Sequence, residues 1–599
     1  MKQEKKRSEI DVKDQWDLKA IYKTEEEALE SLEKLKELTN QICSFQGKIM
    51  QDSNTLYEFY QVYDKLIRLL EKTGIYTMLH LDEDTTDSSA QTLKMKVEHV
   101  LEEVSEKISF IVPELLKTPF SIVETYIQEN PKLELYRFDL EKTYRFQEHT
   151  LSEREEEIIS MATNAMGTAD EVFTHLDNAD AHYGTIQDEE GNEVELTNEN
   201  YSIYIESKNR NVRKNAFETL YHYWESIKHA VSATLKGQIK ATLFQSKVHN
   251  FNSSLEASLF NDNIDLSVYY NLIDTVHKNL DKMYDFMAFK KKQLGLDELH
   301  MYDIHVDLVK EENQNYSYEE AKQIILDALQ PLGEKYISDL KNGLENGWVD
   351  VYPNIGKKSG AYCTASYDTH PYVLLNYYGN VGAVSTAAHE LGHAMHYYYS
   401  IQNQPSIYYS YPIFSAEIAS TVNETILNDY MYRHAKTKNE KIVHLTKFLS
   451  NVRATIYRQT MFAEFEIIMH EKEAKGIPLT EKEFSDTYFE LNHLYYGDNV
   501  VNDNLIRYEW ARIPHFYEPF YVYKYATGLT AAIAIATKIL AGDTEVRDRY
   551  IEFLSSGDSD YPLNLLGKVG VDMTSPEPIQ AALDLFEEKL QELKALCEE

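Results

Sequence analysis

The stretch "STAAHELGHAMHYY" (Ser385 to Tyr398) holds two histidines four residues apart. Its surroundings predict a helix from about 381 to 400, and Asn380 is suited to cap its first turn. Four residues turn through about 400° on a helix, so His389 and His393 project from one face, one turn apart. Two imidazoles at this spacing can bind one metal ion. The stretch therefore predicts a helix that carries part of a metal site.

Glu390 lies about 100° round this helix from His389, beside the expected ion rather than in line with both ligands. A carboxylate placed there can take a proton from a metal-bound water. Gly392 keeps the surface between the two ligands small. Zinc fits this pattern best, because two histidines, a carboxylate and an open water position form a common catalytic zinc set.

A third protein ligand is expected on the helix that follows, "FSAEIASTVNETILNDYMYRHA" (Phe414 to Ala435). Glu417 lies in "AEIAS", which is too apolar to be a solvated helix face. Ser420 and Glu424 follow Glu417 at i+3 and i+7, on the same face. We therefore expect Glu417 to bind the ion and Glu424 to orient one of the histidines.

Most of the remaining chain predicts helices. Leu29, Leu32, Leu35 and Leu38 form one apolar face in the segment 24–47. Comparable patterns predict further helices at 54–80, 90–112, 151–165, 207–247, 266–293 and 317–343.

Two segments predict β-hairpins instead, at 183–197 and at 361–380. In the second hairpin the strand at 372–378 directly precedes the histidine-bearing helix. This strand could brace the helix, or it could hold an extended peptide as an added strand.

Composition restricts the partners of the chain. The net charge of -38 over 599 residues repels phosphate backbones and anionic lipid, which argues against nucleic-acid and membrane partners. The three cysteines, Cys43, Cys363 and Cys597, are too far apart to form a disulfide framework or a metal knuckle. No apolar run follows the basic N-terminal residues, so no signal peptide is expected. These features predict a cytoplasmic protein.

Several motifs together resemble one family of zinc metallopeptidases, the M3 family. "HELGHAMH" and "FSAEIASTVNE" are similar to its metal-binding helices, and "KKSGAYCTASYDTHPYVLLNYYGN" (Lys357 to Asn380) is similar to its oligoendopeptidase F branch. Further similar motifs are "WDLKAIY" (Trp16 to Tyr22), "NRNVRKNAFETLY" (Asn209 to Tyr221) and "IPHFYEPFYVYKYATG" (Ile513 to Gly528).

The resemblance implies a mainly α fold: an elongated multi-helix zincin of the neurolysin-like type, with a small β-hairpin beside the zinc helix and a deep internal substrate channel. We expect an N-terminal helical region at 1–112, a helical region ending in a hairpin at 113–200, and a catalytic domain at 201–599.

The resemblance also implies roles for individual residues. His389, His393 and Glu417 would bind one Zn²⁺ per chain, and Glu390 would act as general base and acid. His515 matches the histidine that stabilises the oxyanion in this family. Among Tyr517, Tyr521, Tyr523 and Tyr525, we favour Tyr525 and Tyr523 for the tyrosine role. The implied activity is a zinc-dependent endopeptidase that attacks internal bonds of short peptides with a zinc-bound water; no oligomer is implied.

Three alternatives remain open at this point. Glu390-x-x-His393 and Glu490-x-x-His493 also match the pattern of di-iron helical proteins, which leaves His389 without a role. A non-catalytic scaffold with a vestigial site is a second alternative, although all five site residues are intact. A carboxydipeptidase that trims dipeptides from C-termini is the third.

Overall fold

The computed structural model describes residues 5–309 and 315–598. It is 72% helical with small sheets only, which confirms the predicted mainly α, multi-helix class. The contacts divide the chain into two compact units. Unit 1 comprises Met1–Thr150, Asn313–Leu427 and Ile535–Gly570; unit 2 comprises Leu151–Glu312, Asn428–Ala534 and Val571–Glu599. Each unit is built from three stretches of the chain. The N-terminal helical region at 1–112, the region at 113–200 and the catalytic domain at 201–599 remain predictions.

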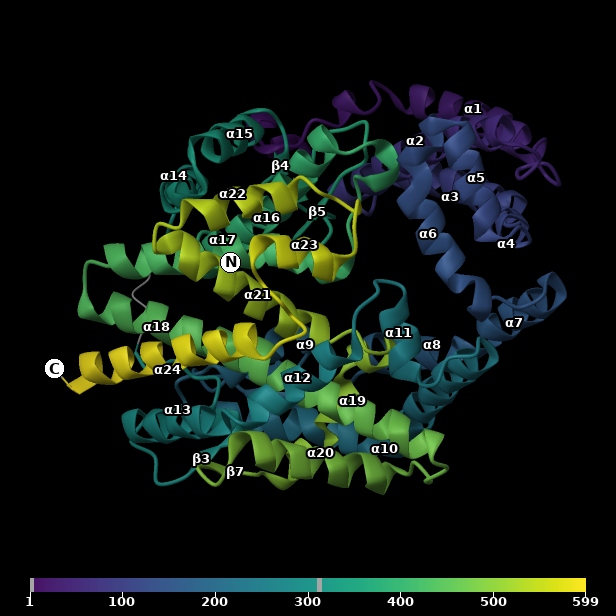
Figure 1. Cartoon of the computed structure of the whole chain (residues 1–599). Coiled ribbons are helices and arrows are strands. Elements are labelled where there is room, and N and C mark those ends of the chain that lie inside the picture. The colour runs from purple at the N-terminus through teal and green to yellow at the C-terminus, as the bar shows by residue number, and fades with distance from the viewer. Residues whose placement is uncertain (1–4, 310–314, 599) are drawn as a thin grey trace. The chain divides into compact units, whose positions relative to one another are not determined.

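The helices of unit 1 come from all three of its stretches (Figure 1). They are α1 Glu25–Cys43, α2 Ser53–Glu83, α3 Ser88–Ile108, α4 Ile111–Leu116, α5 Phe120–Glu129, α6 Arg137–Arg145, α14 Tyr318–Ala328, α15 Glu334–Glu345, α16 Val381–Asn403, α22 Thr544–Leu554 and α23 Pro562–Val569. The division into units falls within α17 (Ile413–His434) and α21 (Tyr523–Leu540).

The first three helices of unit 1 pack against one another along the apolar faces that the sequence predicts. Leu35 of α1, Phe59 of α2 and Val97 of α3 are almost completely buried in one hydrophobic cluster. Each helix begins where a side chain accepts a hydrogen bond from the first turn, as Thr24 does for α1 and Asp52 does for α2. Local capping and one apolar stripe are therefore sufficient to place these helices.

A small sheet lies beside α16 in unit 1. Its strands are β4 Val349–Asp350, β5 Tyr362–Thr364 and β6 Tyr372–Leu374, in the order β4-β6-β5. β5 and β6 form the predicted antiparallel hairpin, with Cys363 opposite Val373. β4 pairs in parallel with β6 on its other side, with Val349 opposite Val373. β6 is therefore the central strand.

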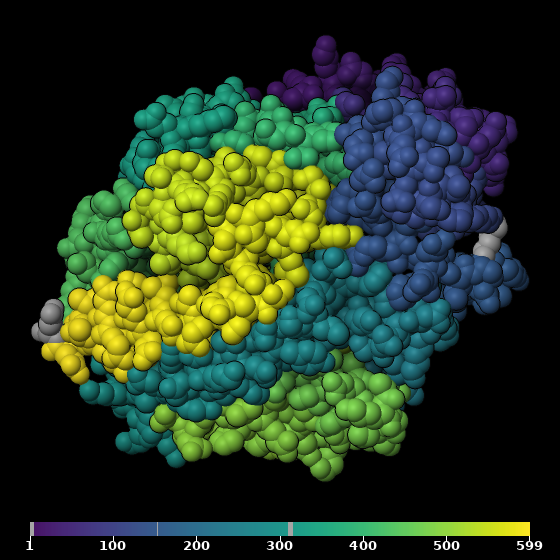
Figure 2. All heavy atoms as spheres, in the orientation of Figure 1, coloured from purple at the N-terminus to yellow at the C-terminus, as the bar shows by residue number. Residues whose placement is uncertain are grey.

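Unit 2 contains the remaining helices and two pairs of short strands. The helices are α7 Glu153–Met166, α8 Thr168–Thr174, α9 Asn198–Ile205, α10 Arg210–Val248, α11 Ser254–Phe260, α12 Leu266–His277, α13 Leu280–Gln293, α18 Lys438–Val452, α19 Arg458–Ala474, α20 Glu481–Tyr496 and α24 Glu577–Glu598. β1 Thr185–Gln187 pairs with β2 Glu193–Glu195, which confirms the first predicted hairpin. β3 Leu299–His300 pairs with β7 Val500–Val501. α24 lies on the surface, in yellow in Figure 2.

Two long predicted helices are wrong because each is interrupted. The segment 266–293 forms α12 and α13, which are separated at Lys278 and Asn279. The segment 317–343 forms α14 and α15, where Pro331 and then Gly333 with a φ of +100° break the helix. Among the described residues, no helix combines the length and the apolar character needed to cross a lipid bilayer.

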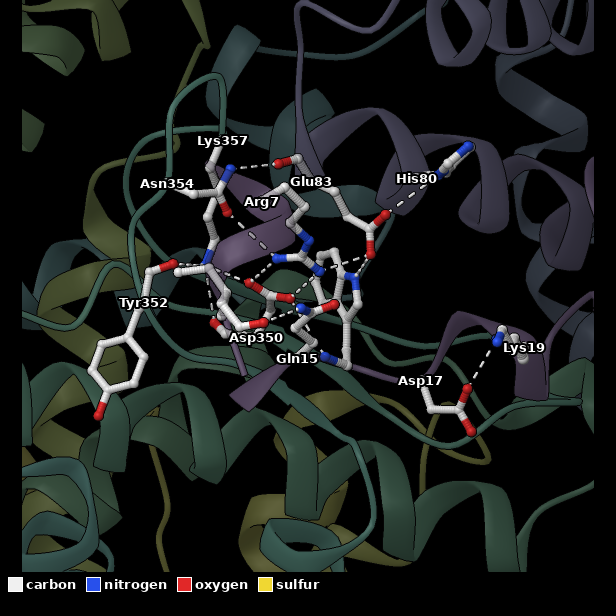
Figure 3. Close-up of polar contacts among 12 residues, drawn as sticks. Arg7, Gln15, Asp17, Lys19, His80, Glu83, Asp350, Tyr352, Asn354 and Lys357 are labelled. Atoms are coloured by element: carbon white, nitrogen blue, oxygen red, sulfur yellow. Dashed lines mark hydrogen bonds and ion pairs between the residues drawn. The ribbon is translucent and has the colours of Figure 1, made fainter. Parts of the chain in front are cut away.

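A buried cluster of charges joins the N-terminal segment to β4 (Figure 3). The Asp350 carboxylate is fully buried; it accepts two hydrogen bonds from the Arg7 guanidinium, at 2.8 and 2.5 Å. The ammonium of Lys357 lies 2.6 Å from the same carboxylate. Arg7 also donates to Glu83 at 2.8 Å, and Glu83 accepts from the Trp16 indole at 2.8 Å. One carboxylate thus holds two cations in the interior of unit 1.

We predict that Asp350→Asn destabilises the protein although it preserves the volume of the side chain. The substitution removes the negative charge shared by Arg7 and Lys357, and breaking a buried ion pair costs about 3–5 kcal/mol. Urea unfolding followed by circular dichroism measures the change. Glu33→Gln is the control, because Glu33 pairs with Lys36 on the surface and such a pair contributes at most about 1 kcal/mol. Equal effects of the two substitutions would refute this account.

Candidate metal centre

The helix α16 carries the two histidines and begins at the predicted cap. The Asn380 side chain accepts a hydrogen bond from the Ala383 amide at 2.7 Å, which confirms its role as N-cap. Gly379, directly before it, has a φ of +85°, which an L side chain rarely adopts. The hairpin of β5 and β6 therefore turns sharply into α16.

Gly392 allows the backbones of α16 and α17 to touch. A methyl group at position 392 would lie 2.6 Å from the Cα of Ser420 and 2.7 Å from the carbonyl oxygen of Ala419. Asn423 of α17 reinforces this contact by donating to the Ala388 carbonyl of α16 at 3.2 Å. The close approach brings a carboxylate of α17 within reach of the histidines of α16.

His389, His393 and Glu417 form one compact group, and each offers an atom within 4.8 Å of the others. The two Nε2 atoms of the histidines lie 3.2 Å apart, and the Nε2 of His389 lies 3.6 Å from the Oε2 of Glu417. Two tetrahedral zinc ligands at bonds of 2.0–2.1 Å are about 3.3 Å apart. The structure thus brings together the three predicted ligands at separations suited to zinc.

Neighbouring groups fix the orientation of both imidazoles. The Nδ1 of His389 lies 2.7 Å from the Oε1 of Glu424, as predicted for a carboxylate that orients a ligand. The ring of His393 is hydrogen-bonded to the backbone of Ala416. Since one nitrogen of each ring is engaged in this way, the Nε2 atoms are left to face Glu417.

The charges of the site favour a bound cation. Burial raises the pKa of Glu390 to about 7 and also raises the pKa of Glu417. The negative charge of the neighbouring Glu424 adds to both shifts. Burial lowers the pKa of His389, but the hydrogen bond and the charge of Glu424 outweigh burial and raise this pKa to about 9. Burial and the charge of His389 lower the pKa of His393 to about 3. Two imidazoles and one carboxylate are the donor types of a catalytic zinc site, and the other two carboxylates add negative charge that favours a cation.

Glu390 occupies a different position from the three grouped residues. It is 7% exposed and lines a cavity of about 730 Å³ in unit 1. The other walls of this cavity come from the segment after β6, the loop before β5 and the start of α16, including Tyr377, Lys357 and Thr386. A carboxylate there can contact a molecule in the cavity without being a metal ligand.

The predicted oxyanion residues belong to unit 2, where two of the three form a group. The Tyr525 hydroxyl lies 3.4 Å from the Nε2 of His515 and 3.5 Å from the hydroxyl of Tyr521. The rings of His515 and Tyr521 are parallel, with centroids 5.8 Å apart. Tyr523 lies apart from this group: its ring is fully buried, with its centroid 5.3 Å from that of Tyr269.

The sequence contained a signal for Tyr521 that the choice of Tyr525 and Tyr523 overlooked. Tyr521 and Tyr525 are four residues apart, and the Lys524 amide donates to the Tyr521 carbonyl at the start of α21. Residues spaced by four share one face of a helical turn, whereas Tyr523 points to a different side. The geometry brings Tyr521, and not Tyr523, next to His515 and Tyr525.

Sequence reasoning also missed Glu466, which supports the loop before α21. Its buried carboxylate accepts a hydrogen bond from the Phe520 amide at 2.7 Å. Phe520 has a φ of +57°, a conformation that a bulky residue seldom adopts without support. No sequence signal distinguishes Glu466 from other glutamates of amphipathic helices, because its partner is a backbone amide far along the chain.

We predict that Gly392→Ala lowers metal content. The added methyl group meets backbone atoms of α17 and not a flexible side chain, so the two helices must separate and Glu417 must move away from the histidines. Gly567→Ala in α23 is the control, because open space surrounds that position and alanine is favoured over glycine in a helix by about 1 kcal/mol. Metal content by mass spectrometry and Tm measure both effects. A Gly392→Ala protein with full metal content would contradict the role of this contact.

Comparison with known proteins identifies the family of this chain. Residues 203–585 match the model of peptidase family M3, and residues 114–183 match that of oligopeptidase F. The oligopeptidase PepF of Bacillus subtilis (strain 168) is 41% identical over 98% of this chain and 88% of that protein. The group B oligopeptidase PepB of Streptococcus agalactiae is 38% identical over 98% of both chains.

A solved structure gives the same assignment. The oligoendopeptidase F of Enterococcus faecium has a TM-score of 0.76 and 34% identity to this chain, and the match covers 96% of this chain and 99% of that one. Together with the family models, which match most of the chain, these relatives show that the chain belongs to peptidase family M3, as a metalloendopeptidase of the oligoendopeptidase F group.

Proposed function

We propose that this chain is a zinc-dependent endopeptidase that hydrolyses internal bonds of short oligopeptides with the help of Glu390. The observation that carries the proposal is the grouping of His389, His393 and Glu417 within 4.8 Å, next to a glutamate that lines a cavity. A di-iron site would leave His389 without a role, whereas this geometry uses it.

The proposed chemistry divides between the ligands and Glu390. Zinc, when held by His389, His393 and Glu417, supplies Lewis acidity that activates water and polarises a carbonyl group. Glu390 accepts the proton of the attacking water and then donates it to the amine of the leaving peptide. A pKa of about 7 for Glu390 suits a group that must take up and release a proton. Glu424 keeps the imidazole of His389 in the orientation that this chemistry needs.

The sheet beside α16 has two outer strands, β4 and β5, at which an extended peptide could be added. Residues 372–374 of the strand predicted at 372–378 are not available for an added strand, because β6 pairs with β4 on one side and with β5 on the other. β5 (Tyr362–Thr364) is the outer strand on the side of the hairpin. We propose that β5 holds the substrate through backbone hydrogen bonds, which recognise extended peptides with little sequence preference.

His515 and Tyr525 are proposed to donate hydrogen bonds to the oxyanion. The family resemblance and the 3.4 Å contact between their polar atoms support this role. Tyr521 joins the same group and is proposed as a further participant in preference to Tyr523.

The proposed partners are short peptides, and the proposed location is the cytoplasm. The net charge of -38 disfavours nucleic acids and anionic membranes, and three widely spaced cysteines suit a reducing compartment.

We predict that Glu390→Gln abolishes hydrolysis while metal binding is retained. The amide cannot take up the proton, and the loss of such a group costs about 10²–10⁴ in kcat. A fluorogenic peptide blocked at both ends measures the rate, and it also distinguishes internal cleavage from removal of C-terminal dipeptides. An active Glu390→Gln protein would show that Glu390 is not the group that accepts the proton of the attacking water.

The matched control is Glu417→Gln, which changes a carboxylate to an amide at a proposed ligand. Metal content should fall in this variant and stay near one ion per chain in Glu390→Gln. Retention of zinc by Glu417→Gln would move the third ligand elsewhere.

We predict that Tyr525→Phe lowers kcat with little change in metal content. The loss of one oxyanion donor typically costs about 10²–10³ in rate. Tyr270→Phe is the control, because Tyr270 is 43% exposed on α12 and its hydroxyl has no proposed role. Steady-state kinetics on the blocked peptide measures both variants, and equal kcat values would disprove the role of Tyr525.

A further inference from the structure

A second cavity, of about 430 Å³, lies within unit 2. Its walls come from α9, α10, α19, the π-helical turn η10 (Arg453–Tyr457) and the 3₁₀ segment η11 (Asn504–Arg512). Three arginines, Arg453, Arg458 and Arg512, line the cavity, as does His515. Glu206 and Glu509 are the acidic residues on its wall.

Only one of the three arginines has a carboxylate partner. The Arg458 guanidinium forms an ion pair with Glu509. The second oxygen of Glu509 accepts a hydrogen bond from the Tyr488 hydroxyl at 2.5 Å. Both oxygens of this carboxylate are therefore occupied, and Glu509 neutralises one charge of the cavity.

Arg453 is a buried cation without a counterion. Its residue is 5% exposed, and one Nη atom donates to the Tyr496 hydroxyl at 3.3 Å. Its Nε is buried and has no hydrogen-bond partner. Within residues 5–309 and 315–598, no carboxylate lies within 4.0 Å of its guanidinium.

Arg512 is in a similar situation on the opposite segment. Its Nε is also buried without a hydrogen-bond partner. The guanidinium lies over the ring of Tyr201, 5.3 Å from the centroid. It forms no ion pair with any residue that the structure describes. Two of the three arginines on one cavity are thus unpaired.

Two further nitrogen-bearing side chains lie close to these cations and respond to their charge. Lys290 is 1% exposed, and its ammonium donates to the Ile304 carbonyl at 2.7 Å. Burial and the charge of Arg453 lower the pKa of Lys290 to about 7. Burial and the same cations hold the pKa of His305, on the cavity wall, well below its usual value. Glu206 is exposed to solvent, and its charge opposes the lowering of the Lys290 pKa.

A folded protein keeps an unpaired buried charge only at a large cost in stability, so its retention here points to a ligand that supplies the missing negative charge. Arg453 begins a π-helical turn, a deviation that is frequent at functional sites. A planar guanidinium pairs best with a planar carboxylate through two parallel hydrogen bonds.

We propose that this cavity binds a carboxylate group of the peptide substrate through Arg453 and Arg512. The proposal rests on the proposed function, because it takes His515 on the cavity wall to contact the substrate. The carboxylate belongs either to the C-terminus of the peptide or to an Asp or Glu side chain. A volume of 430 Å³ accommodates one or two residues of a peptide.

The test measures binding and hydrolysis of matched peptides. The two peptides of the first pair differ only at the C-terminus, which is a free carboxylate in one and an amide in the other. Both peptides of the second pair have a C-terminal amide, and they differ in an internal residue that is Glu in one and Gln in the other. Isothermal titration into the Glu390→Gln protein gives Kd without turnover. We expect one carboxylate form to bind at least about tenfold more tightly than its neutral counterpart, since charge-assisted hydrogen bonds are the strong ones. The pair that shows the difference identifies the source of the carboxylate.

Arg453→Met and Arg512→Met should each remove this preference, mainly through a higher KM for the charged peptide. The matched control is Arg549→Gln on α22, because Arg549 pairs with Glu545 on the surface. This variant should keep the preference for the charged peptide. A structural role would lower Tm, whereas removal of an unpaired buried charge should leave Tm unchanged or higher.

Equal affinity for the charged and neutral peptides in the unsubstituted cavity would overturn the proposal, and so would a large fall in Tm in both methionine variants. These outcomes differ from a failure of the proposed function. The titration measures binding of the carboxylate directly, whereas failure of the proposed function would appear as hydrolysis by Glu390→Gln or as full metal content in Glu417→Gln.

Discussion

The contact between the backbones of α16 and α17 at Gly392 is the constraint on which the site depends. Two helices can approach this closely only where small residues lie at the crossing. Here the missing Cβ of Gly392 leaves room for the Cα of Ser420. The consequence is that Glu417 lies 3.6 Å from the Nε2 of His389, although the two residues lie on different helices. The metal site is therefore a product of helix packing as much as of ligand spacing.

The surroundings of this contact are built to hold the ligands still. Asn423 donates to the Ala388 carbonyl and in turn accepts from the Tyr336 hydroxyl at 3.2 Å. Glu424 and the backbone of Ala416 fix the two imidazole rings. On the other side of α16, the sheet is anchored through Asp350, whose partner Lys357 also lines the cavity beside Glu390. Buried hydrogen bonds and ion pairs thus position groups that would otherwise lose rotamer freedom on binding metal and substrate.

The two cavities described above differ in the charged groups on their walls. The cavity of unit 1 has the Glu390 carboxylate on its wall, close to Glu417 and Glu424. The cavity of unit 2 has unpaired arginines, in a protein whose net charge is -38. An acidic surface repels acidic peptides at long range, whereas buried arginines attract a carboxylate only at short range. This arrangement favours recognition of one carboxylate over a general preference for acidic substrates.

The sequence by itself determined the local features. These features depend on residues near one another in the chain, and the structure contains all of them. They are the spacing of His389 and His393, the cap at Asn380, the β5–β6 hairpin and the apolar setting of Glu417. The helices of the N-terminal region were predictable for the same reason, whereas the breaks at Asn279 and Gly333 were not seen in the apolar periodicity.

Only the tertiary structure decided which distant groups meet. It placed β4 against β6, Tyr521 rather than Tyr523 beside His515, and Glu466 under Phe520. It also gave Gly392 its role as a point of helix contact and left the Nε of Arg453 without a hydrogen-bond partner among the described residues. Such pairings involve residues far apart in the chain, and a single sequence encodes them only through the packing of the whole unit.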